Sequence, residues 1–141
     1  MKSTFILITI LLFSKFSSSQ DKQQVLKFRA FKAGMFSVDP PDSSGWQETD
    51  ILVVINFNDA HLNKINVYAK KNNQYDIVEY IKDYTDESKT SWSVYKGVND
   101  DGELLTIELG LFENTNFEHI STIIITNKNR FSIVYKLKKN E

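Results

Sequence analysis

The 141-residue chain contains no cysteine. This absence excludes disulfide bonds, thiol catalysis, and zinc or iron–sulfur sites that depend on cysteine ligands. The fold must therefore be stabilised by burial of apolar side chains. A domain of about 120 residues can achieve this, because it buries roughly two-thirds of its unfolded surface.

Several catalytic patterns are also missing. The sequence has no serine in a glycine-flanked elbow, no glycine-rich phosphate loop and no calcium-loop pattern. The two histidines, His61 and His119, fall at expected turns and have no partner at a metal-ligand spacing. We therefore expect a non-catalytic protein with no catalytic residue, cofactor or metal. A weak cation site formed by loops 83–89 and 99–102 is left open, and a hydrolase remains a minor alternative.

The formal net charge is only −1. Without residues 1–19, which include Lys2 and Lys15, the chain carries 15 basic and 18 acidic side chains, a net charge of −3. A weakly acidic protein has no field that attracts nucleic acid or an anionic membrane. We expect neither as a partner.

The N-terminus has the three parts of a signal peptide. Lys2 supplies the positive charge, residues 5–13 are almost wholly apolar, and Ser17 and Ser19 are the small residues that signal peptidase requires. This run of nine residues is too short for a membrane-spanning helix, which needs about 20. We expect cleavage after Ser19, export to the periplasm or the extracellular space, and no stable membrane insertion of the mature chain, 20–141.

Apolar and polar residues alternate along most of the mature chain, which is the pattern of β-strands. Residues 99–102, Asn-Asp-Asp-Gly, are typical of a hairpin turn. Longer loops are expected at 34–50, 83–89 and 113–118. The expected strands are 25–33, 51–57, 64–69, 75–81, 90–96, 105–111, 120–126 and 131–137.

Short connections make neighbouring strands antiparallel, so the eight strands form a meander. A flat meander would leave two edges and one face uncovered, and closure removes both edges. We therefore predict an all-β domain, 20–141, closed or nearly closed into a small up-and-down barrel. A two-sheet β-sandwich is the alternative, with residues 34–50 as its crossover.

One tryptophan stands apart from the strand pattern. Trp46 lies in the polar loop before the second expected strand. A tryptophan at this place can plug one end of an eight-stranded barrel or can recognise a partner. Trp46 is therefore the candidate residue for recognition or for a barrel plug.

Three segments resemble parts of a known group of proteins. They are residues 46–55, 64–70 and 74–80, which contain a tryptophan before an aliphatic strand, a Tyr-Ala-Lys strand end and a Tyr-Asp-Ile strand. In these features the chain is similar to small exported bacterial proteins with a single β domain and no assigned activity. The resemblance implies a bacterial envelope setting and no mechanism.

Two functions of different classes follow. Large apolar residues expected to point inward, among them Trp92, Ile107, Leu109 and Phe131, favour a solid core. That makes the protein an interaction module of the cell envelope, which binds an unknown protein through its rim loops. The alternative is a carrier that holds a small apolar ligand inside the barrel, as lipocalins do.

Overall fold

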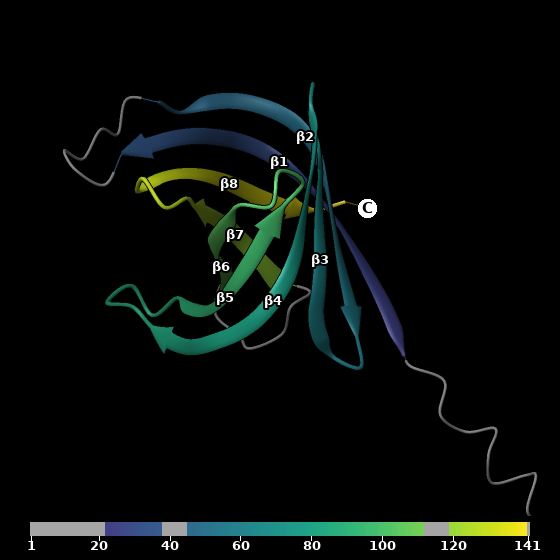
Figure 1. Cartoon of the computed structure of the whole chain (residues 1–141). Helices are drawn as coiled ribbons and strands as arrows, with labels where there is room; N and C mark the ends of the chain where they lie inside the picture. Colours follow the sequence, from purple (N-terminus) through teal and green to yellow (C-terminus); the bar gives the residue numbers. More distant parts are fainter. Residues whose placement is uncertain (1–21, 38–44, 112–118, 141) are drawn as a thin grey trace, which may run out of the picture.

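The computed structural model describes residues 22–37, 45–111 and 119–140. The expected signal peptide, its cleavage site and the loop at 113–118 lie outside these residues. Eight antiparallel strands follow one another in sequence order and close into a barrel (Figure 1). The predicted meander and its closure are thus confirmed, and the sandwich alternative is wrong.

The strands vary in length from seven to fifteen residues. The strands are β1 (Gln23–Ser37), β2 (Gln47–Asn58), β3 (His61–Tyr68), β4 (Asn72–Thr85), β5 (Ser91–Asn99), β6 (Leu104–Leu111), β7 (Ile120–Thr126) and β8 (Phe131–Lys139). The longest strands, β1 and β4, are long because each pairs with one neighbour mainly along its first part and with the other neighbour along its later part.

Two predicted loops are shorter than expected. The expected loop at 34–50 is wrong at both ends, because β1 continues along β8 to the pair Ser37 and Phe131 and β2 already begins at Gln47. The expected loop at 83–89 begins too early, because β4 continues along β5 to Thr85. In both cases the strand extends into residues that include exposed polar side chains. Because these residues do not alternate clearly between apolar and polar, the sequence pattern did not indicate a strand there.

The centre of the barrel is filled by side chains. Residues predicted to point inward from the sixth strand, such as Ile107 and Leu109, are fully buried. Two predictions were wrong, because Phe131 is exposed and Trp92 lies outside the core, over Gly110. The largest fully buried side chains are Phe28, Val53, Ile55, Ile65, Val67, Ile107, Leu109 and Ile123.

The hairpin turns have the expected chemistry. Gly102 has a positive φ of 79°, and the Asn99 side-chain oxygen accepts hydrogen bonds from the amides of Asp101 and Glu103. Asp59 and Ala60 both have positive φ and form the tight turn from β2 to β3. Within the described ranges, no helix has the length and apolar character needed to cross a membrane.

Candidate functional site

The pairing between β3 and β4 is short. The two strands pair from Tyr68 and Asn72 to Lys64 and Asp76, and their register ends there within the described chain. Beyond this point β4 curves away with β5, while β3 continues beside β2 (Figure 1). We call this parting of β3 from β4, beyond Lys64 and Asp76, the seam.

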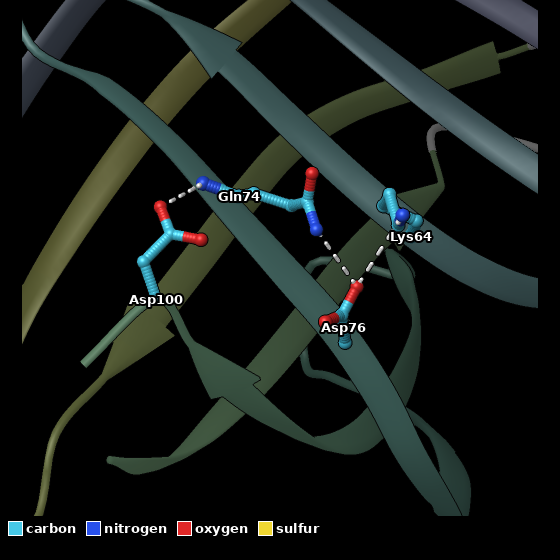
Figure 2. Close-up of polar contacts among 4 residues, drawn as sticks. All are labelled: Lys64, Gln74, Asp76 and Asp100. Carbon is cyan, nitrogen blue, oxygen red and sulfur yellow. Dashed lines mark hydrogen bonds and ion pairs between the residues drawn. The ribbon is translucent and has the colours of Figure 1, made fainter. Parts of the chain in front are cut away.

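Polar contacts hold the closed half of the β3–β4 pair. The Lys64 Nζ lies 3.7 Å from Asp76 Oδ1, and the same oxygen accepts a hydrogen bond of 3.2 Å from Gln74 Nε2 (Figure 2). The backbone N–H of Gln74 donates a hydrogen bond of 3.4 Å to an Asp100 carboxylate oxygen on the β5–β6 turn (Figure 2). The ion pair therefore stands at the last paired position before the seam opens.

The second half of β4, residues 77–85, has β5 as its partner but no register with β3. Its apolar side chains remain open to solvent, since Val78 is 59% exposed, Tyr80 54% and Ile81 45%. Scattered apolar side chains on a surface need no explanation, but several on one unpaired strand edge mark a place where something can bind.

Two β-bulges shape this half of β4. The register with β5 shifts between Ile77 and Glu79 and again between Tyr80 and Lys82. Each bulge inserts an extra residue, so residues three apart come to share one face of the strand. Ile77, Tyr80 and Asp83 therefore all point inward, opposite inward positions of β5.

These inward side chains line an open cleft of about 420 Å³, which we call the seam cleft. One wall comes from the start of β3, and the other walls come from β4 and β5. The lining combines apolar groups with hydroxyl, carboxylate and imidazole groups. The lining residues are His61, Leu62, Ile77, Val78, Glu79, Tyr80, Asp83, Ser93 and Tyr95.

Two tyrosines dominate the polar part of the cleft. The rings of Tyr80 and Tyr95 meet edge to face, with their centroids 5.7 Å apart. Partial desolvation raises the pKa of Tyr80, and a hydrogen bond to Asp83 and the charge of that carboxylate raise it further. Burial raises the pKa of Tyr95 to about 12, against the opposing effect of a hydrogen bond with Ser93. Both phenols therefore stay protonated at neutral pH, beside a carboxylate.

On the outer face of the barrel, side-chain contacts with β5 and β6 hold the second half of β4 in place. Tyr84 stacks on Trp92 and donates a hydrogen bond of 3.0 Å to Glu108. The Trp92 ring lies close over Gly110, where an added Cβ would come within 2.9 Å of the ring. Its Nε1 donates to Asp86 at 2.8 Å. The free edge of β4 is thus held on β5 even though β3 does not cover it.

Trp46 lies at the opposite end of the barrel from the seam cleft. Its ring contacts Phe36 edge to face at 4.9 Å and lies 5.9 Å from Lys136 Nζ. Lys136 points outward, between the buried Tyr135 and Leu137. These contacts put Trp46 on the outer wall, which favours recognition over the plug; both roles remain predictions.

A second cleft, of about 410 Å³, opens at the Trp46 end of the barrel. Its lining is mainly apolar and comes from β1, β2 and β8. Neither this cleft nor the seam cleft is lined by the fully buried central residues. The second cleft is lined by Ala33, Gly34, Met35, Gly45, Gln47, Thr49, Ile51, Ile133 and Tyr135.

The histidines and acidic loops do not come together. His61, expected in a turn, is the first residue of β3 and lines the seam cleft, whereas His119 is exposed beside β7. In the described part of the chain, no group of three His, Asp or Glu side chains is arranged to hold a metal ion.

The seam cleft was not foreseen from the sequence. A signal was nevertheless present, because the apolar doublets Ile77-Val78 and Tyr80-Ile81 interrupt the alternation twice within five residues. Each doublet marks a slip of one residue, which is what a bulge produces. The loss of the β3 partner could not be read in this way, since it depends on how β3 and β4 diverge in space.

Comparison with known proteins gives no further guide. No family model matches the chain, and no match was found among curated proteins or solved structures. The resemblance to small exported bacterial β proteins therefore stays a prediction.

Proposed function

We propose that this is an exported, non-catalytic binding protein that takes a small amphipathic molecule in the seam cleft. The observation that carries this proposal is the convergence of Ile77, Tyr80 and Asp83 on one cleft through two β-bulges. Bulges often re-aim side chains at functional sites. Apolar walls with a few polar groups are the usual composition of a ligand pocket.

The size of the cleft supports a small ligand. A volume of about 420 Å³ lies near the lower end of the roughly 300–1,000 Å³ that ligand pockets span. The barrel interior itself is occupied by large side chains such as Phe28 and Leu109. Carriage of a ligand deep inside the barrel is therefore a weaker proposal than binding at the open seam.

A protein partner that adds a strand to β4 is the second candidate. The unpaired edge with exposed Val78 and Ile81 favours it. The bulges at these two residues oppose it, because they interrupt the regular spacing of edge amides and carbonyls that an added strand needs. The geometry thus supports the small ligand best.

The test is a fragment screen by ¹⁵N–¹H NMR on the mature chain, 20–141, with neutral, cationic and anionic amphipathic fragments. We expect hits whose shift changes cluster on amides 77–83 and 93–95. Tyr80→Ala should abolish these shifts, and Tyr68→Ala should leave them unchanged, because Tyr68 is similarly exposed (47%) but outside the cleft. Hits that cluster elsewhere, or none at all, would contradict the proposal.

A further inference from the structure

The charges that face the seam cleft are unbalanced. Its described lining residues include two carboxylates, Glu79 and Asp83, and no lysine or arginine. Among these described residues, His61 is the only basic side chain. Glu79 is neutralised by Lys96, whose Nζ lies 3.2 Å away. Asp83 is left as the carboxylate that no lysine or arginine of the described lining matches.

The one lysine of β4, Lys82, does not face the cleft. The Lys82 side chain lies over the ring of Tyr84, on the outer face of the barrel, with its Nζ 5.5 Å from the ring centroid. Its register partner, Val94, stands on the outer face between the inward-pointing Ser93 and Tyr95. The strand therefore sends its ammonium group outward and its Asp83 carboxylate inward.

Aromatic rings adjoin the unmatched carboxylate. Tyr80 and Asp83 lie on the same face of β4 and line the same cleft, and the Tyr95 ring meets the Tyr80 ring edge to face. A carboxylate beside aromatic faces is the environment in which proteins bind organic cations, since the ring quadrupole and the carboxylate both attract positive charge. Leu62, Ile77 and Val78 complete the cleft with an apolar surface.

We propose that the seam cleft binds an organic ammonium ion that carries a short apolar or aromatic body. Asp83 pairs with the ammonium group, Tyr80 and Tyr95 lie against it with their rings, and the apolar wall holds the body. This inference rests on the proposed function and adds the chemical class of the ligand. It differs from the carrier of an apolar ligand expected from the sequence, because it requires a positive charge.

The experiment compares three probes that share one body. The amine 2-phenylethylamine, the alcohol 2-phenylethanol and the anion 3-phenylpropanoate are each titrated into the mature chain and followed by ¹⁵N–¹H NMR. We expect the amine to shift amides 77–83 and 93–95 and to bind at least about ten-fold more tightly than the other two. This comparison uses the unmodified chain, so it does not depend on whether a variant folds.

Variants then assign the effect to one carboxylate. Asp83→Asn should weaken the amine about ten-fold and leave the alcohol unchanged. Asp76→Asn is the matched control, because Asp76 is on the same strand, pairs with Lys64 and is not part of the cleft lining. The control should bind the amine as the unmodified chain does.

The outcomes separate this inference from the proposed function. If the three probes shift the cleft amides with equal affinity, or if the alcohol or the anion binds best, the ammonium inference is overturned and the proposed function stands. Equal weakening by Asp83→Asn and Asp76→Asn also overturns it. If none of the probes shifts the cleft amides and the fragment screen has no hits there, both are overturned.

Discussion

Alkaline pH should destabilise this protein through its buried tyrosines. Burial, and to a lesser degree the charges of Tyr135 and Asp100, raises the pKa of Tyr75 from 10.0 to about 12. Burial likewise raises the pKa of Tyr95 to about 12, with opposition from a hydrogen bond with Ser93. Both residues are almost inaccessible in the fold.

The sign follows from which state loses the proton first. Because the folded pKa is the higher one, the unfolded chain ionises above pH 10 while the folded chain keeps its proton. The contribution of each tyrosine is complete below pH 10 and is lost as the pH rises toward 12. At pH 11 the loss is about 1.4 kcal/mol for each tyrosine, since the pH then exceeds the unfolded pKa by one unit and one unit corresponds to about 1.4 kcal/mol.

The assay is urea unfolding at pH 8.5 and pH 11, followed by tryptophan fluorescence. Between the two pH values, Tyr95→Phe should lose about 1.4 kcal/mol less stability than the unmodified chain. Tyr68→Phe, at an exposed site, is the control and should behave as the unmodified chain does. Deprotonation of lysines affects all three proteins alike. If Tyr95→Phe and the unmodified chain lose equal stability, the reasoning is refuted.

Three further predictions concern the core, the contact of Trp92 with Gly110 on the outer face, and the N-terminus. Ile107→Ala should lower the free energy of unfolding by about 2–5 kcal/mol, because Ile107 is fully buried; a loss below 1 kcal/mol in urea unfolding would argue against a filled centre. Gly110→Ala should cost about 1–3 kcal/mol and change the Trp92 emission, because the new Cβ displaces a rigid ring; an unaltered spectrum would contradict the contact. N-terminal sequencing of the exported protein should begin at Gln20, and retention of Met1 would contradict cleavage.

The sequence was sufficient to predict the barrel because the information is local and repeated. In Leu105, Ile107, Leu109 and Leu111, every second residue is apolar, and all four are buried in the structure. With eight such segments and short turns, antiparallel neighbours and closure follow from the need to remove free edges. These arguments require no knowledge of how the strands are staggered.

The position of Trp92 shows what the alternation of apolar residues does not predict. Trp92 is as apolar as an inward residue, yet it lies outside because Gly110 on the neighbouring strand leaves a flat space for its ring. Asp86 is six residues from Trp92 along the chain and Gly110 is eighteen residues away. Neither separation predicts the contact unless the register of the strands is known. Whether a large side chain packs inside or outside thus depends on a cross-strand partner, which alternation alone does not identify.

The free edge of β4 is a place at which two molecules could pair edge to edge. An exposed edge with apolar residues is normally a site of aggregation, and proteins protect such edges with bulges and charges. β4 has both, since bulges fall at Val78 and Ile81 and charges at Glu79, Lys82 and Asp83. The bulges that turn Tyr80 and Asp83 into the cleft are therefore the same features that interrupt a regular edge. One local departure from strand geometry would then account both for a small-molecule site and for an edge that a second strand cannot readily extend.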